Sequence, residues 1–473
     1  MSPSITRRIL LKDALALAAA CGVRGFALNA SAAETRSPAT SMPRVQPPAF
    51  PHRTFDIAKF GAVGDGRTKC TAAIRKAIAA CSAAGGGRVV VPKGSFLTGA
   101  IHLESNVDLH VTKGATLLFS RDPNDYLPVV FTRYEGVECM NYSPFIYAFE
   151  KQNIAVTGPG LLDGQADREH WWPWAGKSRD GWKPGQPNLR RDRKKLFDMG
   201  EHDVPVKNRV FGKGHYLRPN FVQPYRCTNV LLEGFRVKAS PMWELNPVLC
   251  RNVMVRGVQI DSHGPNNDGC DPEASRDVLI SDCTFSTGDD CIAVKSGRNR
   301  DGRRVGVPCE NVLIQGCNMK DGHGGVSIGS EVSGGIKNIV VERCHMSSPN
   351  LQRGLRIKTN SYRGGDIENI AFSHVTIGQV AEAAIEVDFF YEEGAGGPFR
   401  PAVKNIVVSD VACGKSKYAI FLRGYANDPI SGVTISHCTF HDAAKGAFFE
   451  HVESVKIEHT AMNGKTLKFH QNS

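Results

Sequence analysis

The chain has 473 residues, of which 41% are hydrophobic and 22% are charged. This length and composition allow a large core and argue against an intrinsically disordered chain. The formal net charge of +11 favours an acidic polymer as a partner, although a solvated basic surface has the same composition. No arginine-rich tail or nucleic-acid motif occurs, so nucleic acid is not the expected polyanion.

The first 33 residues predict an export signal. The stretch "TRRILLK" contains the paired Arg7 and Arg8, a weakly apolar "ALALAAA" follows it, and small residues lead up to Ala33. This pattern resembles a twin-arginine signal peptide. Two weaker interpretations are an acylated Cys21 and a basic membrane helix, for which the apolar run falls far short of roughly 20 residues. No later segment predicts a membrane span, so we expect export by the twin-arginine route to the periplasm or the extracellular space. Removing the four bases and one acid of this leader lowers the net charge to +8.

Residues 34–54 are rich in proline and predict a linker. In the segment after it, Ile74, Ile78 and Cys81 fall at helical spacing, and three glycines at 85–87 end the pattern. We expect this short amphipathic helix to cap the N-terminal end of a single domain that extends over residues 55–473. Beyond the helix the helical signal largely disappears.

A strand motif recurs from residue 229 onward. Its anchor residue is followed at once by Val or Ile, and the residues three and eight places after the anchor are apolar in every copy. The anchors lie 22 to 36 residues apart, which is a loose period with insertions. They are Asn229, Asn252, Asp277, Asn311, Asn338, Asn369, Asn405, Gly432 and Ser454.

Units this short cannot bury their own apolar face, so neighbouring units must stack. The period predicts an all-β fold, a right-handed single-stranded parallel β-helix, in which equivalent residues of adjoining coils lie about 4.8 Å apart. A β-propeller is the rival architecture. Its repeats are longer, at about 40 residues, and its antiparallel blades need hairpin turns that these units do not signal.

Thirteen cysteines remain once the leader is removed, an odd number for a framework of disulfides. No CxxC pair, HExxH motif or other zinc spacing occurs, so we predict neither a metal nor a cofactor. Seven of these cysteines fall in two columns of the repeat, and we expect them to be small core residues in ladders, with oxidation of adjacent pairs left open. The columns hold Cys283, Cys317, Cys344 and Cys438, and Cys227, Cys250 and Cys309.

Four polar segments break the apolar pattern on successive units. They are "NNDGCDP" (266–272), "GDD" (288–290), "GHGG" (322–325) and "RIK" (356–358). Taken singly, paired Asp residues commonly cap a turn, a His between glycines is commonly a loop residue, and bases on a strand are commonly solvated. Because the segments fall on one flank of consecutive units, we favour a single functional site over four unrelated turns.

The register of the repeat places these side chains next to one another. Asp289 and His323 each lie twelve places after their anchors and therefore share a column. Asp268 lies sixteen places after its anchor, and the loop before it can absorb the difference. We expect one pocket in which Asp268, the pair Asp289 and Asp290, His323, and then Arg356 and Lys358 follow one another along the axis.

Crowded acids in such a pocket are suited to acid–base chemistry. Repulsion between adjacent carboxylates raises one pKa, so that one carboxyl keeps its proton near neutral pH while the others are ionised. Glycoside hydrolysis needs both states, a protonated carboxyl for the leaving oxygen and a carboxylate that activates water.

The segments "NNDGCDP", "STGDDCIAVKSG", "DGHGGVSIGSE" and "GLRIKT", in this order, resemble the signature segments of the polygalacturonase family, glycoside hydrolase family 28. The stretches "FGAVGDGRT" and "GGGRVVVPKGSFLTGAIHL" extend the similarity to most of the chain after residue 55. One departure is Asn267, where the family usually has Thr. Another is the segment of about 168–218, with "HWWPW" and "RRDRKK", which we interpret as an insertion over one end of the groove.

The resemblance implies a hydrolase that cleaves the α-1,4-galacturonosidic bonds of polygalacturonate or pectin with inversion. It implies Asp289 as the general acid, Asp268 and Asp290 as the carboxylates that hold and deprotonate water, and His323 as the group that sets the protonation of the acid. Asn266, Arg356 and Lys358 would bind the substrate, the two bases through a galacturonate carboxylate. Stacked coils place Asp268 and Asp289 roughly 5 Å apart, a spacing typical of retaining enzymes, and on this point we follow the family.

An insertion that closes one end of a groove admits only chain ends, which favours exo action. Its Trp171, Trp172 and Trp174 could stack on sugar rings or pack within the insertion. We expect a monomer that acts on an acidic polysaccharide or oligosaccharide. Two other functions stay open: a pectate lyase-like elimination enzyme with calcium and an arginine base, and a noncatalytic polysaccharide-binding solenoid, which would need neither three acids nor the histidine.

Overall fold

The computed structural model describes residue 42 and residues 44–472. The expected leader, with Arg7, Arg8 and Cys21, lies outside the described residues. Within the described part, no helix is both long and apolar enough to cross a membrane.

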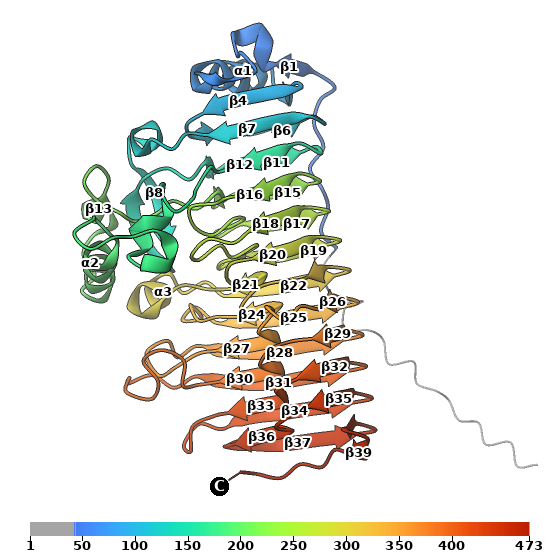
Figure 1. The fold of residues 1–473 in the computed structure, drawn as a ribbon. Coiled ribbons are helices and arrows are strands. Elements are labelled where there is room, and N and C mark those ends of the chain that lie inside the picture. The colour runs from blue at the N-terminus through green and yellow to red at the C-terminus, as the bar shows by residue number, and fades with distance from the viewer. Residues whose placement is uncertain (1–41, 43, 473) are drawn as a thin grey trace, which may run out of the picture. The chain divides into compact units, whose positions relative to one another are not determined.

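The described chain winds into a parallel β-helix, as the repeat predicts, with strands stacked along three faces (Figure 1). The first face is a 13-stranded sheet. Its strands, in spatial order, are β1 (Thr54–Asp56), β3 (Gly87–Val91), β6 (Val107–Val111), β11 (Gln152–Thr157), β15 (Thr228–Glu233), β17 (Arg251–Arg256), β19 (Arg276–Ser281), β22 (Cys309–Gln315), β25 (Ile336–Glu342), β28 (Asp366–Ser373), β31 (Ala402–Ser409), β34 (Ile430–Ser436) and β37 (Val452–Glu458).

The second face is a 14-stranded sheet. Its strands are β2 (Asp65–Lys69), β4 (Gly94–Thr98), β7 (Ala115–Phe119), β12 (Leu161–Asp163), β16 (Arg236–Lys238), β18 (Gln259–Ser262), β20 (Thr284–Thr287), β23 (Asn318–Met319), β26 (His345–Met346), β29 (Thr376–Gln379), β32 (Ala412–Ser416), β35 (Thr439–Ala443), β38 (Ala461–Met462) and β39 (Lys465–Thr466). Only the last pair, β38 with β39, is antiparallel in this sheet.

The third face consists of a three-stranded and a six-stranded sheet. Their strands are β5 (Ile101–His102), β10 (Ile146–Phe149) and β14 (Val222–Tyr225), and then β21 (Ile292–Val294), β24 (Val326–Ile328), β27 (Arg353–Lys358), β30 (Ala383–Asp388), β33 (Tyr418–Arg423) and β36 (Ala447–Glu450). Between the two sheets the ladder thins to single bridges that join Val222, Leu245, Cys270 and Ile292. The polar segments of the sequence begin at this thinned stretch.

The nine anchor residues bend the chain within the first face. All of them have a left-handed backbone, with φ between 52° and 66°, a conformation that Asn, Asp and Gly tolerate better than other residues. The anchor amides also hydrogen-bond to one another across coils: Asn338 donates to Asn311 (3.0 Å) and accepts from Asn369 (3.0 Å). The same bond links Asn252 to Asn229 at 2.9 Å. The repeat predicted the positions of the anchors but not this amide ladder.

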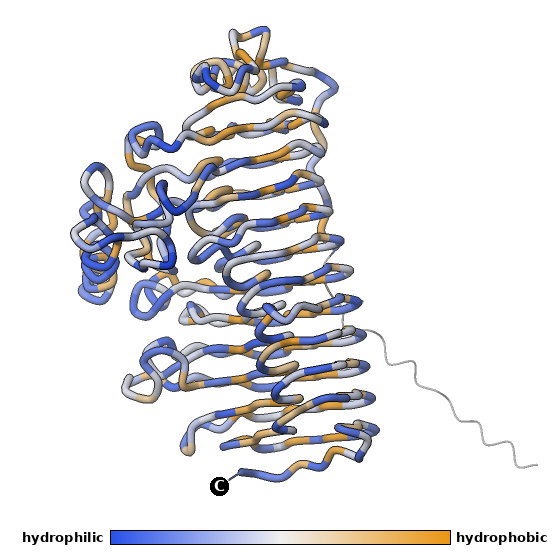
Figure 2. Tube along the Cα trace, in the orientation of Figure 1, coloured by the Kyte–Doolittle hydropathy of each residue, from blue (hydrophilic) through white to orange (hydrophobic). Residues whose placement is uncertain are grey.

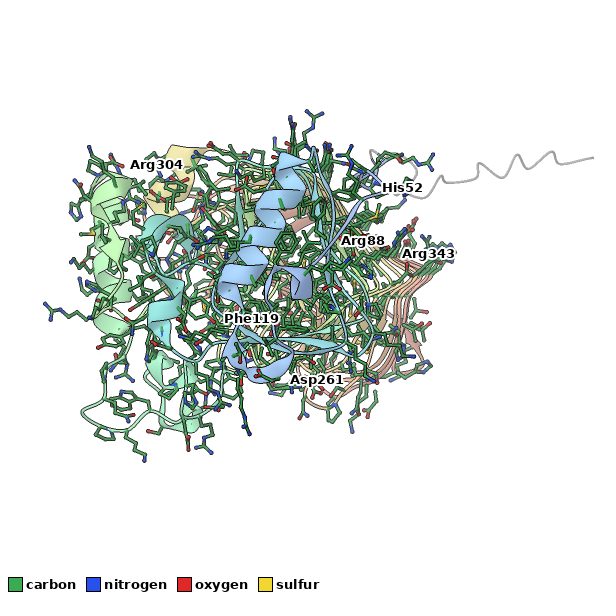
Figure 3. The ribbon with its side chains drawn as sticks, turned by 90° about the horizontal axis from the view of Figure 1, so that it is seen from above. His52, Arg88, Phe119, Asp261, Arg304 and Arg343 are labelled. Atoms are coloured by element: carbon green, nitrogen blue, oxygen red, sulfur yellow. The ribbon has the colours of Figure 1, made fainter. Side chains whose placement is uncertain are left out.

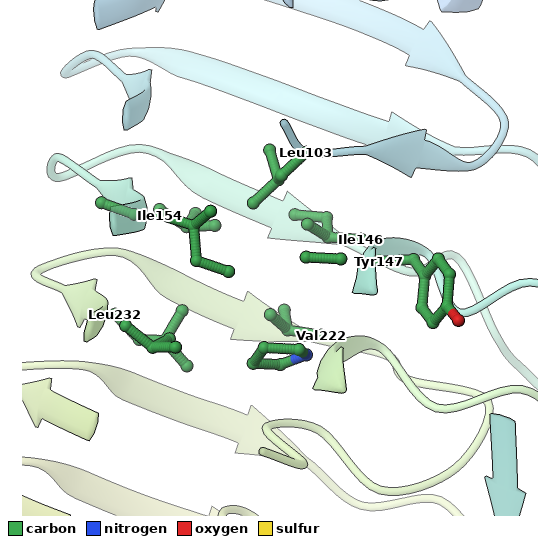
Figure 4. Close-up of a pocket in the computed structure, with 11 residues that line it drawn as sticks. Leu103, Ile146, Tyr147, Ile154, Val222 and Leu232 are labelled. Atoms are coloured by element: carbon green, nitrogen blue, oxygen red, sulfur yellow. The ribbon is translucent and has the colours of Figure 1, made fainter. Parts of the chain in front are cut away.

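The inside of the coils is apolar. Along each coil, apolar residues alternate with polar ones (Figure 2), and the residues of the apolar columns, such as Val253, Ile280 and Ile314, are fully buried. A small cavity within the coils has only apolar and aromatic lining side chains, among them Leu103, Ile154 and Leu232 (Figure 4). It belongs to the core and contains no group for chemistry.

The cysteines belong to this core, as predicted. The described residues hold thirteen of them, all buried and none in a disulfide. In the ladders, Cys317 Sγ donates to the carbonyl oxygen of Gln315 at 3.4 Å. Other ladder thiols, such as Cys250 and Cys283, contact a carbonyl of their own coil and one of the adjoining coil, so these thiols act as small apolar residues with weak hydrogen bonds to the backbone.

Helix α1 (Thr71–Ala83) lies over the N-terminal end of the coils (Figure 3). It buries Ile74, Ala77, Ile78 and Cys81, which include the three residues that predicted it. Part of the predicted linker, residues 44–53, packs along the outside of the coils. Gln46 exchanges backbone hydrogen bonds with the Asn252 side chain at 3.0 and 2.7 Å. Val45 and Phe50 pack against Leu231 and Met254 on the outside of the first face.

A side structure projects from the coils near their middle (Figure 1). It contains β8 (Val130–Tyr134), β9 (Val137–Asn141), α2 (Arg190–Glu201) and β13 (Val210–Phe211), and α3 (Asn299–Val305) lies against α2. The described residues also contain five short 3-10 helices: η2 (Ile57–Phe60), η3 (Pro123–Tyr126), η4 (Trp172–Ala175), η5 (Ser178–Asp180) and η6 (Val206–Asn208). The segment of about 168–218 that we interpret as an insertion forms one structure with the hairpin of β8 and β9, to which its strand β13 pairs.

The side structure has its own core. It consists of Tyr134, Val137, Cys139, Leu189, Leu196, Phe211, Leu217, Met242 and Trp243. The tryptophans considered for sugar stacking serve packing instead: Trp171 is buried among Tyr126, Phe145 and Trp174, and Trp172 Nε1 donates to the Ser240 carbonyl oxygen at 2.8 Å.

Replacing Asn338 with Ala should destabilise the coils. The variant loses two amide hydrogen bonds and places Ala at a φ of 56°, so we expect the free energy of unfolding to fall by about 2–3 kcal/mol. Asn338→Gly also loses the two hydrogen bonds, but glycine adopts a positive φ without strain, so its free energy of unfolding should fall less. Denaturant titration measures both. The control is Lys337→Ala, whose exposed ion pair with Glu368 contributes little; equal losses in Asn338→Ala and the control would contradict the role of the ladder.

Candidate active site

The polar segments meet on adjoining coils, as the register predicts. The Gly269 amide donates to the Asp290 carbonyl oxygen at 2.9 Å, and the His323 amide donates to the Asp289 carbonyl oxygen at 2.9 Å. One coil further, Arg356 on β27 pairs in register with Ser327 on β24. The loop before Asp268 does absorb its extra residues, because the bridge between Cys270 and Ile292 places Asp268 level with Asp290.

Gly288, just before the Asp pair, allows two of these coils to approach. A Cβ atom there would lie 2.2 Å from the carbonyl oxygen of Gly264, which no side chain tolerates. The glycine in "GDD" therefore brings the Asp289 loop against the loop that carries Asp268.

The three acids form one cluster. Asp268, Asp289 and Asp290 each offer a carboxylate oxygen, and these oxygens all lie within 4.8 Å of one another. Two of the acids, Asp268 and Asp289, line a pocket that is partly open to solvent. Its other lining residues are Glu135, Arg193, Trp243, Asn266, Lys295, Ser330, Glu331, Lys358, Tyr391 and Glu392.

Asp290 lies behind the pocket and is ionised. It is fully buried, and its two oxygens contact Lys358 Nζ at 2.6 Å and Ser327 Oγ at 2.7 Å. Burial by itself would raise its pKa, but the charges of Lys358, Arg356 and Lys295 outweigh burial and hold the pKa of Asp290 below its usual range. Its charge is thus a fixed feature of the site.

Of the three clustered acids, Asp268 is the one that favours its proton, and burial raises the pKa of the neighbouring Asp271 in the same direction. Burial, and then repulsion from Asp271 and Asp289, raise its pKa well above the usual range, and Lys295 opposes this only in part. The sequence predicted that repulsion between Asp289 and Asp290 keeps one carboxyl protonated. The structure modifies this expectation, because cations balance the charge of Asp290 and burial is the largest cause of the raised pKa of Asp268.

Asp289 is the most exposed acid of the cluster. Its side chain is 18% exposed, compared with 4% for Asp268 and 0% for Asp290. His323 Nδ1 lies 2.8 Å from Asp289 Oδ1, as the shared column predicts. The same oxygen accepts from the Asp290 amide at 3.0 Å, so this carboxyl faces the pocket with a fixed orientation.

The expected substrate-binding residues all contact other groups of the protein. Lys358 lines the pocket but pairs with Asp290, and Arg356 lies 3.8 Å from Asp290 and 3.4 Å from Glu386. Both bases are therefore already paired within the protein, which the sequence did not indicate. Asn266 also lines the pocket, and its Oδ1 accepts from Arg218 at 2.7 Å.

Asn267, the departure from the family pattern, has a structural role. It is fully buried. Its Oδ1 accepts from the Gly264 amide and from Ser262 Oγ at 2.8 Å each, and its Nδ2 donates to the Ser240 carbonyl oxygen at 3.0 Å. It fixes the loop that carries Asp268.

Sequence reasoning missed Lys295 and Glu331. The buried Lys295 ammonium lies 3.6 Å from Asp268, 3.7 Å from Asp271 and 3.4 Å from Glu331, and 4.5 Å from the ring centre of Trp243. Its pKa is raised, since burial, which would lower it, is outweighed by these carboxylates. Lys295 and Glu331 lie within two of the motifs quoted above, "STGDDCIAVKSG" and "DGHGGVSIGSE". A base at a buried position beside clustered acids was the signal that could have identified them. Trp243 and Tyr391 lie outside every motif.

The three-acid cluster has a geometry that could also hold a cation. However, the ammonium groups of Lys358 and Lys295 already lie 2.6 and 3.6 Å from its carboxylates. The three carboxyls therefore suit proton transfer beside the fixed ammonium groups of these two lysines.

Comparison with known families agrees with this geometry. The model of a family described as glycosyl hydrolases family 28 matches residues 207–460, more than half of the chain. This chain belongs to that family. The site therefore belongs to a glycoside hydrolase, and its acid cluster lies inside the matched segment. A second model, described as rhamnogalacturonase A/epimerase, pectate lyase-like, matches residues 54–110.

Individual family 28 proteins and their relatives resemble the chain over most of its length. A crystal structure of a hyperthermoactive exopolygalacturonase from Thermotoga maritima is 47% identical, with a TM-score of 0.87, and the alignment covers 89% of this chain and 94% of that one. An exo-poly-alpha-D-galacturonosidase of Dickeya chrysanthemi is 28% identical over 76% of this chain and 62% of its own length. A probable polygalacturonase of Vitis vinifera is 28% identical over 82% of this chain and 74% of its own.

Lys295→Gln should move the acidic limb of the activity–pH profile to higher pH. Removing the ammonium takes away a charge that lowers the pKa of Asp268, so any step that needs this carboxylate ionised begins at higher pH. We expect a roughly tenfold lower rate on the acidic side. Lys295→Arg keeps the charge and is the matched control. An acidic limb at the same pH in the wild type and Lys295→Gln would show that Lys295 does not set the charge of Asp268.

Proposed function

We propose that this enzyme hydrolyses α-1,4-galacturonosidic bonds of polygalacturonate or pectin and releases units from a chain end. The observation that carries the proposal is the pocket itself. Two carboxyls, Asp268 and Asp289, open into it beside the fixed cations Lys295, Lys358 and Arg193. Acid–base chemistry next to several cations suits a sugar that carries its own carboxylate better than a neutral sugar.

In the proposed mechanism Asp289 donates a proton to the glycosidic oxygen as the bond from that oxygen to C1 breaks. A water molecule held by the carboxylates of Asp268 and Asp290 attacks C1 from the other face and gives its proton to Asp268, while Asp290 keeps its charge. Asp289 suits the acid role because it is the most exposed of the three and contacts His323. Asn266, Arg356 and Lys358 are proposed to bind the substrate.

The proton of the cluster is favoured on Asp268, whereas the proposed acid is Asp289. These carboxyls lie within 4.8 Å of each other, so the proton belongs to the group and not to one residue. We assign its delivery to Asp289 because this carboxyl reaches furthest into the pocket. Asp290 keeps its charge throughout, since Lys358 is bound to it.

Exo action is supported by what surrounds the pocket. Glu135 and Arg193 come from the side structure, and Tyr391 and Glu392 come from the loop 389–401. Arg298 joins the two parts: its guanidinium lies 4.3 Å from the Phe197 ring on α2 and 3.1 Å from Glu393. Such walls favour a chain end over the middle of a polymer.

A substrate polymer of this kind lies outside the cell, which agrees with the proposed export signal in residues 1–33. We propose the twin-arginine route, a secreted or periplasmic catalytic domain over residues 55–473, and action as a monomer on cell-wall pectin. The proline-rich segment of 34–54 is proposed to connect the export signal to the catalytic domain.

Incubation with polygalacturonate tests the proposal. The wild type should release free monogalacturonate of normal mass, identified by chromatography and mass spectrometry, with little early loss of viscosity. Asp289→Asn should lower kcat by about 100-fold or more, because the general acid is lost. Products lighter by one water would indicate a pectate lyase-like elimination, and binding without cleavage in the wild type would indicate a noncatalytic solenoid.

The same incubation, followed by proton NMR, reports the anomer that forms first. We expect inversion, from the family. The cluster spacing by itself favours retention, since inverting enzymes commonly hold their carboxyls about 6.5–9.5 Å apart. Retention of configuration would therefore overturn the assignment of Asp268 and Asp290 as water-activating groups, while leaving the substrate unchanged.

A further inference from the structure

We propose that the ion pair of Glu135 and Arg193 recognises the terminal galacturonate unit and thereby sets where the chain is cut. This inference rests on the proposed function and names residues for it. Both residues line the pocket that contains Asp268 and Asp289, and neither belongs to the motifs that carry the acid cluster.

Of the basic run 190–195, Arg193 is the base that lines this pocket. Arg190 donates to the Gly176 carbonyl oxygen and lies 5.5 Å from the Trp182 ring centre. Lys194 pairs with Asp198 on the exposed side of α2, and Lys195 lies 5.8 Å from the Phe211 ring centre. The run is thus not a uniform basic face, because its members have different partners.

Arg193 is held in position by packing and by its helix. Its guanidinium lies 4.6 Å from the ring centre of Phe197, one turn further along α2. The preceding Asp192 accepts from the Tyr216 amide and contacts His215 Nδ1, both at 2.8 Å. These contacts fix the first turn of α2 against the segment that contains His215 and Tyr216. The next residue, Arg193, therefore points to the pocket.

Glu135 is held equally firmly. It forms, with Gly136, the two-residue turn between β8 and β9, and both residues have a positive φ, of 42° and 81°. The Gly136 carbonyl oxygen accepts from the Arg298 amide at 3.1 Å, and a Cβ at Gly136 would come within 2.7 Å of that nitrogen. A positive φ at both central residues is what a two-residue hairpin turn of type I′ requires, so the turn holds Glu135 in a fixed position beside the pocket.

The pair leaves groups free for a ligand. Arg193 uses Nε (2.7 Å) and Nη2 (2.6 Å), both to Glu135 Oε2. Within the described residues, Arg193 Nη1 and Glu135 Oε1 make no hydrogen bond, although the charge of Glu392 also acts on Arg193. The two N–H donors of the charged guanidinium's Nη1 and one free carboxylate oxygen match the carboxylate and a hydroxyl of a terminal uronate.

Initial products from polygalacturonate and kinetics on trigalacturonate test this inference. In Arg193→Ala, we expect KM to rise by about 10- to 100-fold with a smaller change in kcat, since a charge-assisted contact to the end unit is lost. Digalacturonate and longer products should appear among the first products. Arg193→Lys should recover part of the loss, because it keeps the charge but not the planar fork, and Glu135→Gln should raise KM without removing the arginine.

The matched control is Lys194→Ala, which removes one positive charge from the exposed side of the same helix and should behave as the wild type. Thermal unfolding of each variant separates loss of the fold from loss of recognition. Unchanged KM and unchanged first products in Arg193→Ala would overturn the inference while hydrolysis stands, and so would a loss of stability with unchanged first products. A wild type that releases no galacturonate would overturn the proposed function and this inference together.

Discussion

Parallel stacking in register is the constraint on which this molecule depends. Each coil hydrogen-bonds to the next, so equivalent residues lie about 4.8 Å apart however long the loops between them are. The left-handed anchors of the first face, with their amide ladder, repeat the same bend from coil to coil. Register therefore converts residues as distant in sequence as Asp268 and Lys358 into neighbours.

The same stacking creates an electrostatic problem that the site exploits. Four acids, Asp268, Asp271, Asp289 and Asp290, lie in a poorly solvated place where charge is costly. Lys358 offsets the charge of one of them and Lys295 lies between two others. The result is a cluster in which one carboxylate stays ionised and another favours its proton, and this asymmetry is what acid–base catalysis requires.

Much of this architecture could be predicted from the amino-acid order, because the pattern of apolar columns depends on local spacing. The β-helix, the buried cysteines, the capping helix and the meeting of Asp268, Asp289, Asp290 and His323 follow from it. The pairing of Arg356 and Lys358 with protein carboxylates, the packing of 44–53 and the hairpin of β8 and β9 do not. They depend on tertiary contacts between segments with no shared period, and Trp243 and Tyr391 reach the pocket from such segments.

The central claim is that Asp268 and Asp290 differ in charge within one cluster. Carbon-13 NMR of protein labelled at the aspartate carboxyl carbons measures this directly. We expect a protonated carboxyl signal at pH 7 that disappears in Asp268→Asn, and a signal that stays ionised to the lowest pH at which the protein is folded and disappears in Asp290→Asn. If both carboxyls instead titrate close to the ordinary aspartate value of about 3.9, the account of the site is wrong.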